Sequence, residues 1–408
     1  MPPDDIPTPD AHDHADSWRR HPVPRMLAGL VIALALGTFI ALLATWPGGT
    51  EITSPSGGLD TVLARVTAVE EEPCASPGVE GCRRVGFEVK EGDSRGATGT
   101  VVVGGDRHQD IRLSVGDRIR VIETPEESRV AIGGMEVDRW SFSDFDRRVP
   151  LLVLALLFVG IVLVAGRLKG ARALLGLGLS LVVVLLYLVP GLLGGTNAVL
   201  VAVTAALAVM LLTIPLAHGW GLTTIAATLG TAASLGITVI LAMIFADFAR
   251  LTGFSDEAST YLSATSSTLS IQGLLLAGIV IAALGVLDDV TVSQASTVLA
   301  LRHANPLLNY GQLFTRALSV GRDHITATVN TLVLAYVGAS LPTLLVFAVV
   351  DVSAIQAMNG ENVASQIVGT LVGSIGLMAA MPITTALAAL LATHIPAHEI
   401  DPHGGHVH

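Results

Sequence analysis

Charged side chains are scarce in this sequence. They make up 14% of its 408 residues, whereas an ordinary soluble domain carries about 25%. Hydrophobic residues reach 51%. This composition excludes an ordinary soluble domain over most of the chain and predicts segments that cross a membrane. The net charge of −11 argues against nucleic acid as a partner.

Motifs of several large enzyme classes are also missing. The sequence contains no Walker phosphate-binding loop, no Gly-x-Ser-x-Gly nucleophile elbow and no His-Glu-x-x-His zinc motif. ATP-driven transport by this chain alone therefore has no support. An intramembrane enzyme is the weakest hypothesis, because no nucleophile and base form a visible set. We expect no enzymatic activity and no cofactor, apart from a bound cation of unknown identity.

Cysteine is nearly absent, and its two occurrences lie close together. Cys74 and Cys82 share one short polar segment. A metal site needs more ligands than this segment offers. We predict a disulfide, because we expect the segment to lie outside the cytoplasm; two unpaired thiols are the alternative.

Long apolar runs are the main feature that is present. They are continuous rather than alternating, so they predict helices and not the strands of a membrane barrel. We predict a polytopic α-helical membrane protein with about eight spans, over residues 26–46, 149–166, 173–189, 198–217, 222–248, 271–287, 325–350 and 364–392.

The composition divides the chain into five parts. We predict a disordered cytoplasmic tail (1–25), a first transmembrane helix (26–46), an extracytoplasmic β domain (47–148), a seven-helix transmembrane domain (149–392) and a His-rich cytoplasmic tail (393–408). The run at 26–46 resembles a signal peptide, but it is too long and no small-residue cleavage site follows it. We therefore interpret it as a retained span.

Residues 47–148 differ from the rest. Alternating short runs separated by Gly and Asp turns predict five strands, at 61–69, 84–90, 99–103, 117–122 and 129–132. This pattern favours a small β-barrel of the OB type. Because the strands carry few aromatic residues and mixed charges, we favour an assembly or gating module over a ligand-binding one.

Loop charges predict the orientation. Basic residues concentrate in loops on one side, at Arg167, Lys169, Arg172, Arg302, Arg316 and Arg322. The short loops on the other side carry acids, with Arg250 as their single basic residue. The positive-inside rule then predicts that both termini lie in the cytoplasm and the β domain lies outside.

The most informative polar feature is an acidic pair, Asp288 and Asp289, at the end of the run 271–287. Asp289, Ser293 and Ser296 share one helix face by their spacing, and Thr291 and Gln294 offer further oxygens. Adjacent carboxylates bind a hard cation or share a proton. The alternative is a helix end that exposes acids to water.

A second polar group opens the run 325–350. Asp323 and Asn330 lie on one helical stripe and His324 lies on the next. We expect this group to face the acidic pair from the cytoplasmic side, where His324 would relay protons. The alternative is that Asp323 caps a helix that begins there.

Two further patterns have simpler interpretations. Hydroxyls at helical spacing in the run 222–248 favour packing between helices, namely Thr224, Thr228, Thr231 and Thr238. The C-terminal tail carries candidate metal ligands without a recognisable spacing, namely His398, His403, His406 and His408. An unstructured tail is the alternative, so the metal remains unknown.

Three segments together resemble the YibE/F family of bacterial membrane proteins. They are residues 287–296 (LDDVTVSQAS), 321–342 (GRDHITATVNTLVLAYVGASLP) and 371–376 (LVGSIG). The resemblance covers about residues 60–392. It implies a multi-pass protein of the bacterial cytoplasmic membrane with a soluble segment after the first span. It implies no particular catalytic or binding residues.

Two functional hypotheses follow. The first is a transporter or permease in which Asp288, Asp289, Asp323, His324 and Asn330 form a cation or proton site near the cytoplasmic side. The second is a non-enzymatic assembly or accessory protein whose β domain binds an envelope protein. The lipid bilayer is a partner in both, and the oligomeric state stays open.

Overall fold

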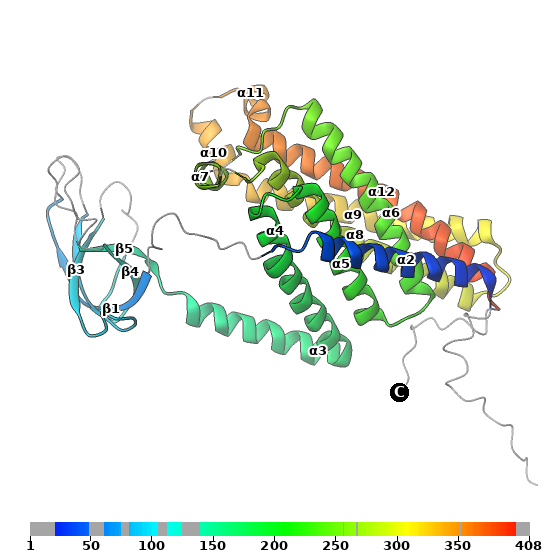
Figure 1. The fold of residues 1–408 in the computed structure, drawn as a ribbon, viewed down its shortest axis with the longest axis horizontal. Helices are drawn as coiled ribbons and strands as arrows, with labels where there is room; N and C mark the ends of the chain where they lie inside the picture. Colours follow the sequence, from blue (N-terminus) through cyan, green and yellow to red (C-terminus); the bar gives the residue numbers. More distant parts are fainter. Residues whose placement is uncertain are drawn as a thin grey trace, which may run out of the picture. The chain divides into compact units, whose positions relative to one another are not determined.

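The computed structural model describes residues 21–48, 61–74, 81–104, 112–124, 139–255, 257–266, 268–350 and 352–396. The chain forms two compact units. One comprises Glu51–Val164, and the other comprises Met1–Thr50 and Ala165–His408. The first contains a β-sheet, and the second contains most of the helices (Figure 1).

The sheet has five antiparallel strands in the order β3-β2-β1-β4-β5. Their bounds are β1 (Thr61–Glu71), β2 (Arg83–Val89), β3 (Thr98–Val103), β4 (Arg118–Glu123) and β5 (Trp140–Phe145). The pairing register shifts within β1 and within β4. Such irregularities bend strands. The sheet curls, and its two outer strands, β3 and β5, lie beside each other (Figure 1).

One aromatic contact joins β5 to β2 beside the outer strand β3. Trp140 of β5 is 5% exposed, and its ring lies edge-on to Phe87 at a centroid distance of 5.6 Å. A Cβ atom on Gly99 of β3 would lie 2.7 Å from the Trp140 ring. Only glycine therefore lets β3 approach the indole closely enough to close the curl.

The predicted strands at 61–69, 84–90, 99–103 and 117–122 correspond to β1–β4. The segment 129–132, predicted as the fifth strand, lies outside the described residues, and β5 is formed by Trp140–Phe145 instead. In the sequence, the alternation of aromatic residues and serines in Trp140-Ser-Phe142-Ser is the pattern that indicates β5. Beside β1 and β2, a disulfide joins Cys74 and Cys82, whose Cα atoms are 5.2 Å apart.

Trp140→Ala should destabilise the sheet selectively. Emptying this buried site costs about 3–5 kcal/mol. Amides of β2 and β3 should exchange with deuterium much faster in the full-length protein, as measured by mass spectrometry. Ser141→Ala, an exposed neighbour, serves as the control and should leave exchange unchanged. Equal exchange in the two variants would show that packing of the Trp140 indole does not hold the curled sheet together.

The helical elements from α3 onward follow one another with short connections, whereas the sheet separates α2 from α3. The helical elements are α2 (Pro22–Ala44), α3 (Arg148–Val183), the π-helix η3 (Val184–Leu188), α4 (Val189–Leu193), α5 (Ala198–His218), α6 (Leu222–Phe248), α7 (Glu257–Thr265), α8 (Ile271–Ala304), α9 (Tyr310–Ala339), α10 (Leu341–Val349), α11 (Ala354–Asn359) and α12 (Glu361–Thr393).

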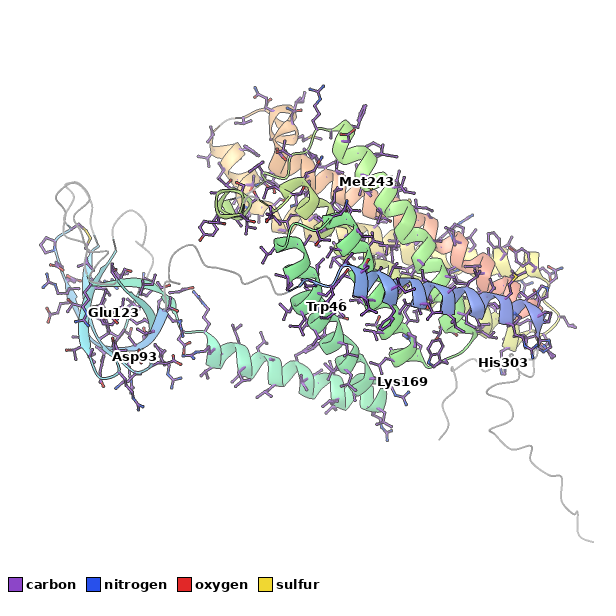
Figure 2. All side chains as sticks on the ribbon, viewed as in Figure 1. Trp46, Asp93, Glu123, Lys169, Met243 and His303 are labelled. Carbon is purple, nitrogen blue, oxygen red and sulfur yellow. A yellow bond between two sulfur atoms is a disulfide. The ribbon has the colours of Figure 1, made fainter. Side chains whose placement is uncertain are left out.

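Within the described residues, six helical runs are long and apolar enough to cross a membrane, and the bent pair α9–α10 would make a seventh. Large apolar side chains lie on their outer surfaces, as at Met243 of α6 (Figure 2). One run, Arg148–Leu193, has 46 residues, and Arg167 (φ 49°, ψ −129°) interrupts its helical geometry. The sequence-based count of eight treats the two sides of Arg167 as separate spans.

Helices α6, α8 and α12 pack most extensively against one another. Glycine makes this possible, since a Cβ atom on Gly230 of α6 would overlap Thr384 of α12. A Cβ atom on Gly376 of α12 would likewise overlap Thr238 of α6. The hydroxyls of Thr231 (α6) and Thr291 (α8) form a 2.6 Å hydrogen bond. The threonine stripe of α6 thus packs between helices, which is the favoured interpretation of its spacing.

The helices that carry the two polar groups extend beyond the predicted spans, and neither alternative helix end is present. α8 does not end at Leu287, because it continues to Ala304 and buries Val290, Val298 and Leu299 beyond the acidic pair. α9 begins at Tyr310, where Asn309 and Gln312 form a capping box. Asp323 therefore lies inside α9 and is not its N-cap.

Gly376→Ala should lower the melting temperature of the purified protein in detergent, because overpacking at Thr238 costs about 1–3 kcal/mol. The matched control is Gly373→Ala, one turn away on the same helix, where an added Cβ atom meets nothing within 4 Å. This control should be neutral or slightly stabilising, since alanine favours helix. The reverse order of melting temperatures would contradict the packing described for α6 and α12.

Candidate functional site

The acidic pair lies in the middle of α8. At 1.5 Å per residue, Asp288 is about 25 Å from the start of the helix. Two neighbours of α8, α5 and α6, contribute threonines near this level, namely Thr213 and Thr231. The carboxylates therefore lie within the packed length of the bundle rather than at the end of the helix.

The carboxylate of Asp288 is poorly satisfied. Its Oδ1 atom is buried and has no hydrogen-bond partner. Its Oδ2 atom lies 3.4 Å from the Thr213 hydroxyl, which also donates to the Val209 carbonyl at 2.9 Å. One hydroxyl hydrogen is shared between these acceptors, and the shorter contact holds it better. A buried carboxylate oxygen without a donor is costly unless a proton, a cation or water occupies the site.

Asp289 has a different environment, because its side chain is exposed. Ser293 is also exposed, and Ser296 is half-buried on the same stripe of α8. These three residues share one face, as their spacing predicts. The two adjacent carboxylates thus point to different stripes, one toward α5 and one toward the outer surface of α8.

Gln294 belongs to the packed interior and not to the acidic face. Its amide nitrogen donates to the Ala317 carbonyl of α9 at 3.0 Å and to the Thr385 hydroxyl of α12 at 2.8 Å. A Cβ atom on Gly321 of α9 would lie 2.5 Å from its amide oxygen. Gln294 therefore ties three helices together, and the expectation that it adds an oxygen to the acidic site is wrong.

The second predicted group makes no direct bond to the first among the described residues. Asp323, His324 and Asn330 are exposed on α9. Within the described residues, no hydrogen bond or ion pair links them to Asp288 or Asp289. The buried stripe of α9 consists of Leu313, Ala317, Gly321 and Ile325. Because α9 begins a full three turns before Asp323, this stripe sets the rotation of the helix and turns the polar residues outward.

The tail histidines His398, His403, His406 and His408 lie outside the described residues. Within the described part of the chain, no group of three or more His, Cys, Asp or Glu side chains could hold a metal ion. A cation bound at the acidic pair would need hydroxyl, carbonyl or water oxygens to complete its coordination.

These features define a multi-pass helical membrane protein with a separate curled β-sheet. A family model described as YibE/F-like protein matches residues 154–394, and the chain belongs to this family. The match covers the helices from α3 onward; the sheet, which the sequence resemblance included, precedes it. No curated protein and no solved structure matches the chain.

Gln294→Leu should destabilise the bundle, because the Ala317 carbonyl loses its side-chain donor and a buried bond is worth about 1–3 kcal/mol when one partner is removed. The melting temperature in detergent should fall. Ser293→Ala, the exposed neighbour on α8, is the matched control and should change it little. Similar melting temperatures for both variants would show that the hydrogen bonds of Gln294 to α9 and α12 do not stabilise the bundle.

Proposed function

We propose that this protein is a transporter or permease whose cation or proton site is formed by Asp288 and Asp289. The observation that carries the proposal is the unpartnered, buried Oδ1 atom of Asp288 in the middle of an apolar helix. Ionisable groups inside membrane spans are costly, and they generally face a transported ion, a proton relay or a water-filled cavity. No catalytic reaction is part of the proposal.

The contrast with Gln294 supports a functional role for Asp288. Two turns of α8 separate the two residues at most, yet the Gln294 amide donates both of its hydrogens to the protein. A polar side chain kept for helix association is expected to be satisfied in this way. Asp288 is not, so helix association does not explain its presence.

We propose a topology of eight spans in the bacterial cytoplasmic membrane, with both termini in the cytoplasm and the OB-like sheet outside. The break at Arg167 supports it, because Arg167, Lys169 and Arg172 form a basic segment between two apolar stretches. Basic residues favour the cytoplasmic side. In this topology the exposed Asp323 and His324 lie toward the cytoplasmic end of α9.

The alternative is an accessory protein that acts through its sheet, with an envelope protein as partner. The separate compact sheet unit favours it. In that case the acids of α8 serve the fold, and their replacement changes stability without changing the response to ions.

The test is a thermal-shift series on the full-length protein in detergent, over monovalent and divalent cations and over pH. A ligand that binds only the folded state at 100 times its Kd stabilises it by about 2.7 kcal/mol. We expect one cation, or a change in pH, to shift the melting temperature by several degrees. The shift should be lost in Asp288→Asn and reduced in Asp289→Asn.

Asp247→Asn is the matched control, since Asp247 is an exposed acid at the end of α6. It should keep the full response. If no ion and no pH shifts the wild type, or if all three variants respond alike, Asp288 and Asp289 form no ligand site. A positive response leads to uptake assays with that ion in proteoliposomes.

A further inference from the structure

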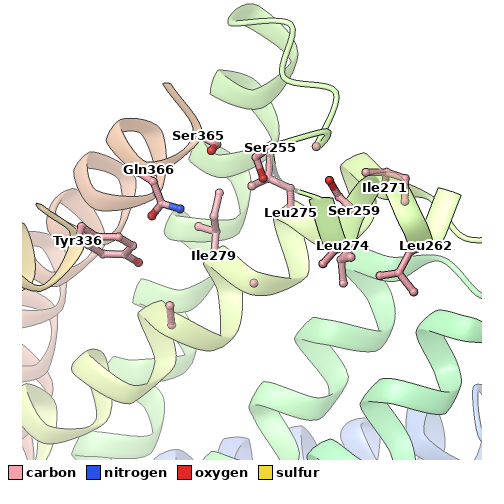
Figure 3. Close-up of a pocket in the computed structure, with 15 residues that line it drawn as sticks. Ser255, Ser259, Leu262, Ile271, Leu274, Leu275, Ile279, Tyr336, Ser365 and Gln366 are labelled. Atoms are coloured by element: carbon pink, nitrogen blue, oxygen red, sulfur yellow. The ribbon is translucent and has the colours of Figure 1, made fainter. Parts of the chain in front are cut away.

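A cavity of about 320 Å³ lies between α7, α8, α9 and α12, well away from the acidic pair along α8. Figure 3 shows its wall, with Leu275 and Ile279 of α8 between Tyr336 and Gln366 on one side and Ser255 and Ser259 on the other. Every described residue that lines it is uncharged. The cavity thus combines an apolar wall with a few hydrogen-bonding groups, as small-molecule sites do.

The rim of the cavity is firmly built. The carboxylate of Glu361, at the start of α12, accepts hydrogen bonds from the backbone nitrogens of Thr252 and Gly253 at 2.6 and 2.5 Å. It also accepts one from the Thr252 hydroxyl. Gly253 has a φ of +88°, and a Cβ atom there would overlap the Ile271 carbonyl. The turn that leads from α6 toward α7 is therefore held in one conformation, and the cavity is preformed.

Two polar groups of the cavity are available to a ligand. Within the described residues, neither the Tyr336 hydroxyl nor the Gln366 side-chain amide makes a hydrogen bond to protein. In Figure 3 both side chains point into the space beside Ile279. A phenol hydroxyl and a carboxamide together offer donors and acceptors but no charge.

Small residues continue from the cavity toward the acidic pair. Gly278 and Ala282 line the cavity, and Gly285 and Asp289 follow on the same stripe of α8. A Cβ atom added to Gly278 or Gly285 would meet nothing within 4 Å. The stripe of α8 between the cavity and Asp289 therefore carries no bulky side chain.

We propose that this cavity is an outward-facing vestibule that binds a small, uncharged, hydrogen-bonding solute and leads along α8 to Asp289. The inference rests on the proposed transport function and names its substrate class. A charged solute would meet no compensating charge among the described residues that line the cavity. At about 30 Å³ per water molecule, the volume equals roughly ten waters, which sets the size of the solute.

Cysteine accessibility tests the vestibule, because the chain's two cysteines form a disulfide and leave no thiol background. Gly278→Cys and Ala282→Cys are treated in intact cells with methyl methanethiosulfonate, which is neutral, and with its sulfonatoethyl and trimethylammonioethyl analogues. Gln272→Cys, exposed at the start of α8, corrects for intrinsic reactivity. Gly160→Cys, on an exposed apolar face of α3, marks a lipid-facing position.

After correction, the neutral reagent should modify Ala282→Cys at least tenfold faster than either charged reagent, and Gly160→Cys should not react. Glycerol or acetamide should slow modification of Ala282→Cys, and adding Gln366→Leu should remove this protection. Glycine, a zwitterion, should not protect. Two variants on different turns of α8 guard against misfolding of one of them.

Three results would overturn the inference. They are no modification at either position, equal rates with neutral and charged reagents, and no protection by either neutral solute. None of these bears on the ion response of Asp288. An intact response with a failed vestibule rejects only the substrate class, whereas a lost response with a working vestibule rejects the ion site.

Discussion

The dominant constraint on this protein is that a membrane interior offers no water to its polar groups, so that each must be satisfied by protein or by something bound. Gln294 meets the constraint within the protein, through α9 and α12. Asp288 does not, because one of its oxygens is buried without a donor. This difference between two residues of one helix separates a structural polar group from a candidate functional one.

The surroundings of Asp288 are fixed by close backbone contact. Gly230 and Gly376 bring α6 and α12 together at positions where a methyl group would overlap a threonine. Without a hydrophobic force between helices in lipid, such packing and the interhelical hydrogen bonds determine the arrangement. Helix α8, which carries the acidic pair, packs against both α6 and α12. The carboxylates therefore cannot move to new hydrogen-bond partners unless the packing of all three helices changes.

The sheet unit follows the rules of a water-soluble domain. Its core is an ordinary apolar cluster, and its closure depends on Trp140 above Gly99. The family match starts after it, at residue 154. Family membership therefore describes the helical part of the chain.

The sequence alone determined the membrane class, the apolar helices, four of the strands and the acidic pair, because these depend on local composition and periodicity. The predicted spans are shorter than α8 and α9, since hydropathy falls at Asp288 while packing continues to Leu299. The sequence also predicts that Asp323, His324 and Asn330 face the acidic pair. Only the tertiary structure shows that these three side chains are exposed, because the rotation of a helix is set by which stripe its neighbours bury, and in α9 that stripe runs through Leu313, Ala317, Gly321 and Ile325.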